Sequence, residues 1–465
     1  MKTTIRYASL LVLCVMACLS TGNAQKANAL YFLSDAPIHT RMNPAMTPKS
    51  SGFGLGLSSM SLYLYSDLAV NDLFIPGPNG ELRTFLHPEA DKQAFLSGLD
   101  DVSSISSGMS LEFFTLGIRV KDMYISMHSS LNLDLGLGIP KDLFSLVMLG
   151  MDPNASSNRF DLTDFRFNAM VFNKTGVGFS KSIGDIFTVG ANVDYLIGLT
   201  NMEAGFNKLY IDANSTEWQV TSNGYFQVAG PSDIQFAYDE NNHFNGVDFN
   251  SSSSLTNLLN SSIAGSGISV DLGVTAKPLP FLKISAALTD LGAIKWKKDG
   301  IQKVSSNGTF TYEGMDLSTS EDEGGDEEGN KLAEELQGMV NFTKETVDKG
   351  YSSRLTSKLN IGAEAGVLNN KITFGLLSQT GFATGGVYQD VMAAANFKPG
   401  GIFQSALTYS LLHGEMSAFG AAVNLKLLFF NLFASADYIP LRYTTNMIPL
   451  RNSYFNTQIG FNFMF

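Results

Sequence analysis

The chain has 465 residues, of which 44% are hydrophobic and only 16% charged, with a net charge of −12. An ordinary soluble domain carries about 25% charged residues, and a disordered chain has few apolar ones, so the composition fits neither. Beyond the N-terminus, no stretch approaches the roughly 20 apolar residues that a membrane-spanning helix needs. The negative charge argues against nucleic acid as a partner, because phosphates require a cationic surface.

Residues 1–24 have the features of a secretion signal. Lys2 and Arg6 form a basic start, an apolar core follows, and small residues ending at Ala24 form a cleavage site. A lipoprotein signal ending at Cys18 is the alternative. Both cysteines, Cys14 and Cys18, fall in this segment. We therefore expect an exported mature chain without disulfide or thiol chemistry.

Residues 25–51 form a separate N-terminal segment that lacks the alternation of a strand. Pro37, Pro44 and Pro48 interrupt it, and Asn43-Pro44-Ala45 lies near its middle. The segment is too irregular to span lipid. It is either a periplasmic tail or a plug inside the lumen of the structure that follows.

From residue 52 onward, the sequence alternates between apolar and polar or small residues. Within residues 267–277, Ile268, Val270 and Leu272 share one face, and Ser269 and Asp271 share the other. Similar alternation occurs over residues 358–367, 419–429 and 454–465. Neighbouring side chains on a strand point to opposite faces, so each segment has one apolar and one polar face. A soluble β-sandwich shows the same pattern.

Connector length distinguishes a membrane barrel from a sandwich. Short connectors, such as 184–185 and 369–370, take turns with a second set that includes all the longest ones, 66–108, 200–265 and 299–352. Outer-membrane barrels combine short periplasmic turns, longer outer loops and an even number of strands. Our count gives fourteen strands. We predict an all-β fold, a single transmembrane antiparallel β-barrel over residues 52–465.

The outer loops are predicted to hold short helices and one acidic segment. Residues 141–150 place Leu143, Phe144, Val147 and Met148 at helical spacing. This helix either collects a hydrophobic ligand or caps the barrel mouth, and the cap is the favoured interpretation. Leucines within 251–259 and apolar residues within 331–349 predict further helices.

The acidic outer loop spans residues 313–350, with its carboxylates concentrated between Glu321 and Glu328. Such a loop could bind calcium or the divalent cations that bridge lipopolysaccharide. The spacing of a calcium-binding loop is absent, so a solvated acidic loop is the simpler interpretation.

The C-terminus carries a second signal for a barrel. Phe461, Phe463 and Phe465 alternate with other residues and end the chain. This pattern is typical of strands recognised by the barrel-assembly machinery. A strand that ends at the carboxyl terminus can also pair with the first strand, which closes the sheet and leaves no open edge in lipid.

No catalytic pattern emerges from the sequence. The five histidines are scattered, and spacing alone cannot bring a serine, a histidine and a carboxylate to one wall. Gly265-Ser266-Gly267 precedes a strand rather than a helix, so the context of a phosphate-binding loop is missing. We expect no enzymatic activity, no cofactor and no metal site.

These features together resemble the long-chain fatty-acid transporter superfamily of outer-membrane barrels, and more closely an uncharacterised branch that is akin to PorV-type barrels. Residues 270–274, 287–292 and 358–363 fit this branch. The resemblance implies that the N-terminal segment is a hatch inside the barrel, with Asn43, Pro44 and Ala45 at the matching position. It identifies no ligand contacts, because the outer loops match nothing that can be aligned.

The resemblance predicts passive transport of small hydrophobic molecules across the outer membrane of a Gram-negative cell. The alternative is a non-transporting barrel that anchors or assists exported proteins. Expected partners are outer-membrane lipid, lipopolysaccharide and the barrel-assembly machinery, together with a small hydrophobic ligand or an exported protein. A continuous apolar path from the mouth to a wall opening would favour transport, and a sealed lumen with a broad exposed loop patch would favour the anchor.

Overall fold

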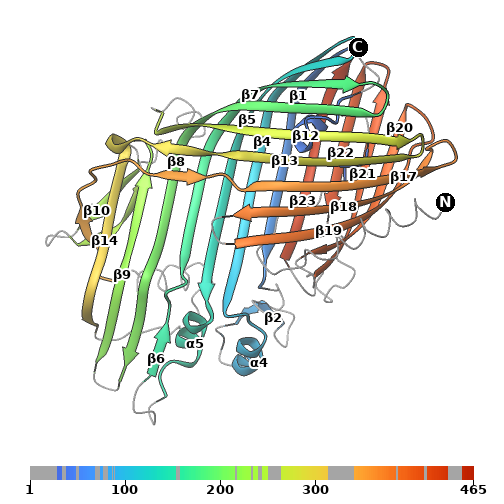
Figure 1. The fold of residues 1–465 in the computed structure, drawn as a ribbon. Coiled ribbons are helices and arrows are strands. Elements are labelled where there is room, and N and C mark those ends of the chain that lie inside the picture. Colours follow the sequence, from blue (N-terminus) through green and yellow to red (C-terminus); the bar gives the residue numbers. More distant parts are fainter. Residues whose placement is uncertain are drawn as a thin grey trace.

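The computed structural model describes residues 29–33, 38–48, 52–68, 74–76, 82–85, 87, 90–152, 158–214, 217–231, 234–238, 243–249, 263–312, 340–383, 386–412, 416–437 and 453–465. Within these residues, fourteen antiparallel strands form a closed barrel (Figure 1). They are β1 (Phe53–Ser66), β4 (Val102–Val120), β5 (Met123–Pro140), β7 (Arg166–Ile183), β8 (Phe187–Ala213), β12 (Gly265–Leu279), β13 (Leu282–Trp296), β17 (Ser357–Val367), β18 (Ile372–Ala383), β19 (Gly386–Phe397), β20 (Phe403–Leu412), β21 (Met416–Leu427), β22 (Phe430–Asp437) and β23 (Ser453–Met464).

The first and last barrel strands close the sheet. β1 pairs with β4 on one side and with β23 on the other, from Gly54↔Met464 to Ser66↔Ser453. The backbone N–H of Phe465 donates to the carbonyl of Phe53 over 2.8 Å. The predicted barrel, its fourteen strands and its closure at the C-terminus are therefore confirmed.

The barrel has an apolar outside and a polar inside. On β12, Ile268 is 61% and Leu272 48% exposed, whereas Ser269 and Asp271 are at most 1% exposed. This is the reverse of a soluble protein, and it follows from the alternation because apolar side chains face lipid while polar ones face the lumen. No described helix is long and apolar enough to span a membrane.

β8 continues far beyond the barrel wall. It has 27 residues, about 90 Å at 3.3 Å per residue, while a barrel strand needs only about 9–11 residues to cross a membrane. Its outer half pairs with β9 (Trp218–Ala229), which pairs with β14 (Ile301–Tyr312) and then β15 (Thr343–Glu345). We call β8 from residue 201, β9, β14 and β15 the outer sheet; it projects past the barrel (Figure 1).

The outer sheet corrects two predictions. The connector 200–265 was expected to be a loop, but β8 extends to Ala213 and β9 follows, because cross-strand pairing continues after Thr200. The predicted helix over 331–349 is wrong for its described part: residues 340–349 contain β15 and no helix, since Thr343–Glu345 pairs with β14. The helix predicted within 251–259 lies outside the described residues.

Smaller elements surround the outer end of the barrel. α5 (Lys141–Leu149) confirms the helix predicted over 141–150, and its Phe144 packs with Leu96 of α4 (Lys92–Ser97). The others are β2 (Phe74–Pro76), β3 (Leu82–Thr84), β6 (Asn158–Asp161), β10 (Ile234–Tyr238), β11 (Phe244–Phe249), β16 (Ser352–Arg354) and a 3₁₀ turn (Lys298–Gly300). The buried apolar face of α5 agrees with a cap at the barrel mouth.

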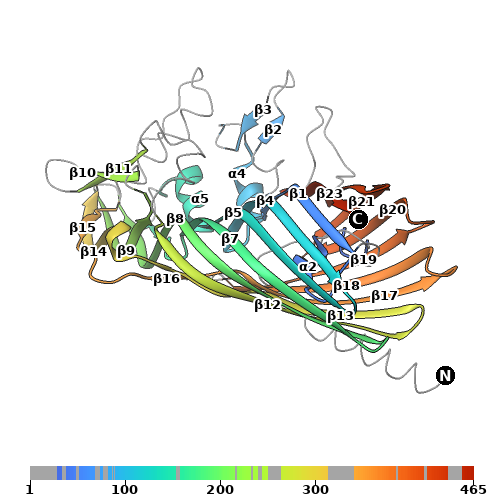
Figure 2. The same ribbon diagram turned by 90° about the horizontal axis from the view of Figure 1, so that it is seen from above.

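The N-terminal segment lies inside the ring of strands, as Figure 2 shows for its short helix α2 (His39–Met42). Its described residues, 29–33 and 38–48, are almost all buried. The apolar side chains of residues 29–33 pack against inward-facing residues of β18 to β22. This position inside the barrel brings the segment against the polar wall described next.

Candidate functional site in the barrel lumen

Asn43 fixes the N-terminal segment to the barrel wall. Its side-chain nitrogen donates to the carbonyl of Ala286 on β13 over 3.2 Å, and its side-chain oxygen accepts the backbone N–H of Ala45 over 2.9 Å. The Asn43 side chain is fully buried. The predicted plug element therefore combines a tight turn with a contact to the wall.

Two glycines make room for this element. A β-carbon on Gly273 of β12 would overlap the side-chain oxygen of Asn43, and one on Gly190 of β8 would overlap the backbone of Pro44. Glycine is the only residue that allows such a close approach of backbone. Gly273 belongs to the motif 270–274 that carried the sequence resemblance, so part of that motif is the seat of Asn43 and Pro44.

Further hydrogen bonds hold the segment around the lumen. Asp437 on β22 accepts the backbone N–H of Ala29 over 3.0 Å. Asn360 on β17 donates to the carbonyl of Met42 over 3.3 Å, and Asn192 on β8 donates to that of Thr40 over 3.1 Å. These bonds join side chains of the wall to the backbone of the segment. Each is worth only about 0.5–3 kcal/mol, so the segment is held by many weak contacts.

A buried ion cluster runs across five neighbouring strands of the wall. The ammonium of Lys174 on β7 lies 2.9 Å from Asp194 on β8, 3.6 Å from Asp271 on β12 and 2.7 Å from Asp290 on β13. His128 on β5 lies 2.9 Å from the other oxygen of Asp194. Lys174 balances carboxylates from three strands and so ties the wall together on its inner face.

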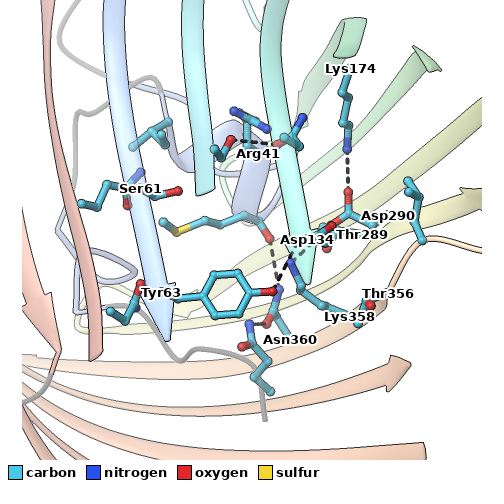
Figure 3. Close-up of a pocket in the computed structure, with 18 of the residues that line it drawn as sticks. Arg41, Ser61, Tyr63, Asp134, Lys174, Thr289, Asp290, Thr356, Lys358 and Asn360 are labelled. Atoms are coloured by element: carbon cyan, nitrogen blue, oxygen red, sulfur yellow. Dashed lines mark hydrogen bonds and ion pairs between the residues drawn. The ribbon is translucent and has the colours of Figure 1, made fainter. Parts of the chain in front are cut away.

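Asp290 owes its place in the cluster to an unusual backbone conformation. Its φ is +59°, and the pairing of β12 with β13 shifts register between Val270 and Leu272. Left-handed conformations are uncommon outside glycine and are tolerated best by Asn and Asp. Asp271 accepts the backbone N–H of Asp290 over 2.7 Å. The bulge turns Asp290 into the lumen, where Lys174 meets it (Figure 3).

A cavity of about 220 Å³ lies between the N-terminal segment and the ion cluster. Tyr31, Arg41 and Met42 of the segment line it together with Lys174 and Asp290. Its wall is mixed. The polar part includes Ser61, Tyr63, Asn132, Asp134, Lys358, Asn360 and Gln379, and the apolar part includes Ile38, Met109, Phe172, Leu355 and Leu377.

The structure separates the two predicted groups of site residues. Asn43, Pro44 and Ala45 lie in the lumen, whereas Phe461, Phe463 and Phe465 gather at the short-turn end of the barrel. There Phe465 stacks on Phe429 with ring centroids 5.8 Å apart. Recognition of these phenylalanines during assembly stays a prediction.

The ion cluster is what sequence reasoning missed. Alternation placed Asp271 on the polar face, but Lys174 lies on another strand, and only the strand register brings the two together. The acidic residues of 313–339 lie outside the described part of the chain. Among the described residues, no group of three or more His, Cys, Asp or Glu could hold a metal ion.

The fold and this lumen define the class of protein. A closed antiparallel barrel with a lipid-compatible outside and a polar, partly filled inside is an outer-membrane β-barrel. More particularly, the chain belongs to one protein family, described as Family of unknown function (DUF5723), whose profile matches residues 44–437. No curated protein matches the chain.

Several solved barrels are similar to the chain. The toluene transporter TbuX of Ralstonia pickettii is 11% identical over 96% of both chains, with a TM-score of 0.44. A FadL homologue of Pseudomonas aeruginosa is 10% identical over 94% of this chain and 95% of its own, with a TM-score of 0.41. The Pseudomonas putida toluene transporter TodX is 9% identical over 96% of both, with a TM-score of 0.39. At identities of 9–11%, the likeness concerns the fold alone, and the function rests on this chain's own residues.

Proposed function

We propose that this protein is a passive outer-membrane transporter of small hydrophobic or amphipathic molecules, with the N-terminal segment as its gate. The observation that carries the proposal is the cavity in the lumen, one side of which is formed by Tyr31, Ile38, Arg41 and Met42 of that segment. A molecule in the cavity can leave past the segment only if the segment shifts.

The polar contacts of the segment suit a gate. They are mostly single hydrogen bonds between wall side chains and segment backbone, such as those of Asn360 and Asn192. A ligand favours the shifted state only if it binds that state more tightly, and its binding must also offset the apolar burial of residues 29–33 wherever the shift gives this up. Burying the apolar part of a ligand in the cavity contributes about 25 cal/mol to the binding free energy for each Å² removed from water.

A reversible cross-link between Asn43 and Gly273 tests the gate. The side-chain oxygen of Asn43 touches the place of a Gly273 β-carbon, so cysteines at both positions bring their β-carbons within reach of a disulfide. The only natural cysteines, Cys14 and Cys18, lie in the predicted signal. We expect intact cells that produce N43C/G273C to take up radiolabelled toluene or benzyl alcohol only after dithiothreitol treatment. The control is the same double variant kept reduced throughout, because a side chain at position 273 alone already presses on the segment.

Two outcomes would contradict the proposal. Equal uptake in the oxidised and reduced states would show that the segment is not a gate. If cells with the unmodified protein take up no more of the probe than cells without it, the protein does not transport the probe.

The alternative of an anchor for exported proteins is favoured by the outer sheet. Its solvent-facing side carries a ladder of amides in which Asn207 donates to Asn223 and Asn223 donates to Asn307, over 2.9 and 3.0 Å. Such a broad, exposed face offers hydrogen bonds to another protein. If the protein pulls down an exported protein and N223A loses this binding without a change in uptake, an anchor role beside transport is supported.

A further inference from the structure

We propose that the lumenal cavity is a binding site for a small amphipathic molecule with an uncharged hydroxyl group. The inference takes from the proposed function only that small molecules reach the lumen. It rests on three inward-facing residues of β17 and β18, namely Lys358, Asn360 and Gln379. Figure 3 shows Lys358 and Asn360 pointing into the same space as Tyr63.

A chain of amide hydrogen bonds leaves one acceptor unused. The side-chain nitrogen of Asn360 donates to the carbonyl of Met42, so its side-chain oxygen faces Gln379, whose nitrogen donates to it over 2.6 Å. The direction of both amides is thereby fixed. The remaining oxygen of Gln379 is buried without a hydrogen-bond partner among the described residues, and Gln379 is 7% exposed and lines the cavity.

An unpaired buried acceptor costs about 1–3 kcal/mol. A ligand that donates a hydrogen bond to Gln379 removes this cost, whereas a pure hydrocarbon leaves it in place. The site therefore distinguishes a ligand with an O–H group from the same molecule without one, as sites built to pair a hydroxyl generally do.

Lys358 supplies a donor to the same ligand. Its ammonium lies 3.5 Å from Asp290, beyond a good hydrogen bond, because Lys174 holds Asp290 more closely at 2.7 Å. The Lys358 side chain is 27% exposed and lines the cavity, so its N–H groups can reach a ligand oxygen. One hydroxyl group can accept from Lys358 and donate to Gln379, since an O–H is both donor and acceptor.

The charge of the cavity argues against an anionic ligand. Each cation of the lining already has a carboxylate partner: Lys174 lies within 3.6 Å of three aspartates, Lys358 lies 3.5 Å from Asp290, and Arg41 lies 3.8 Å from Glu112. Asp290 and Asp134 themselves line the cavity. A carboxylate ligand would face both acidic groups in a poorly solvated space, where like charges repel strongly. It would also present no donor to Gln379.

The remainder of the lining fits an apolar body. Met109, Phe172, Leu355 and Leu377 contribute apolar side chains to the cavity. The volume of about 220 Å³ is below the 300–1,000 Å³ that is usual for drug-sized ligands. A single ring or a short chain bearing one hydroxyl matches both properties.

Three probes that share one ring test the proposal: benzyl alcohol, toluene and benzoate. Calorimetry on the full protein in nanodiscs, with empty nanodiscs subtracted, measures binding without requiring passage. We expect benzyl alcohol to bind about tenfold more tightly than toluene, since about 1.4 kcal/mol corresponds to tenfold, and benzoate to bind more weakly than benzyl alcohol. Toluene or benzoate binding as tightly as benzyl alcohol would overturn the proposal.

Variants connect the selectivity to the named residues. Gln379→Leu and Lys358→Met should each weaken benzyl alcohol about tenfold and leave toluene unchanged. Gln389→Leu is the matched control, because Gln389 is an equally buried inward-facing glutamine with an unpaired oxygen that does not line the cavity. An equal loss for all three probes in Gln379→Leu would contradict the inference. If the protein shows the expected selectivity but its uptake is unaffected by the cross-link, the binding site is supported and the gate is contradicted.

Discussion

The two sides of the lumen hold the N-terminal segment by different physical means. On the inner face of β4 to β13, which we call the ionic half, Asn192 joins the segment to Asp271 and so to the ion cluster. On the inner face of β18 to β23, the amide half, the segment lies against apolar side chains such as Phe433. Most polar residues of the amide half are uncharged: Gln379, Gln389, Asn396, Gln404, Asn424, Asn431, Asn456, Gln458 and Asn462.

This difference shows which side of the lumen can change. Charges in the ionic half depend on one another, and water can replace few of their contacts without cost. In the amide half, Asn431 and Asn462 have side-chain atoms without partners among the described residues, so water that enters there gains hydrogen bonds. We infer that the segment separates from the amide half first and stays longest on the ionic half.

The largest expected effect comes from breaking the ionic half. Lys174→Met leaves Asp194, Asp271 and Asp290 without their shared cation, and removal of one partner of a buried ion pair costs about 3–5 kcal/mol. We expect a lower urea midpoint in detergent, read by the heat-modifiable mobility of the folded barrel.

Lys181→Met on the same strand is the control for this prediction. Lys181 is exposed and lies 4.0 Å from Asp122, so its loss should change stability by less than about 0.5 kcal/mol. Equal midpoints for the two variants would show that the ion cluster does not stabilise the wall.

Gly273→Val should displace the segment from the ionic half without unfolding the barrel. The new side chain overlaps Asn43 and Pro44, and overpacking of this kind costs about 1–3 kcal/mol. We expect faster hydrogen exchange of the segment and higher toluene uptake. Gly136→Val is the control, because nothing lies within 4 Å of a β-carbon there. Unchanged exchange in Gly273→Val would contradict the assigned seat.

Asp437→Asn tests how the amide half holds the start of the segment. Both carboxyl oxygens accept the N–H of Ala29, over 3.0 and 3.2 Å, and the substitution replaces one of them with an amide nitrogen that cannot accept this bond. Hydrogen exchange over residues 29–33 should therefore rise several-fold while exchange over residues 43–46 stays constant. A rise in both regions would mean that the segment moves as one body.

The smallest effect is expected outside the lumen, in the outer sheet. A hydrogen bond from Lys303, 2.8 Å away, lowers the pKa of Glu345 below its ordinary value of 4.5. A lowered pKa stabilises the folded form above the ordinary pKa, and this contribution is lost as pH falls through the lowered value. Both groups are partly exposed, so at most about 1 kcal/mol is involved.

We expect exchange protection of residues 343–345 to decrease below pH 4.5. Glu345→Gln should abolish this pH dependence. A pH dependence that persists in Glu345→Gln would assign it to another group.

The barrel could be predicted from sequence because its constraints are local. Alternation fixes which residues face lipid, and short turns such as 369–370 fix the neighbours of each strand. The full length of β8 was not predicted, because the same alternation continues past residue 200 without marking where the lipid-facing part ends. The ion partners of Lys174 were not predicted, because its carboxylates belong to three other strands and a register shift beside Asp290 completes the cluster. The local sequence pattern shows neither the partners nor the register shift.

The seam between β1 and β23 has a consequence for biogenesis. Gly54 pairs with Met464, so the two edges that must meet lie at opposite ends of the barrel sequence. Until β23 reaches β1, both strands present an unpaired edge, and contacts this distant along a chain form slowly. The open sheet therefore offers two templates for pairing with other chains, a route to aggregation that the seam removes once it forms.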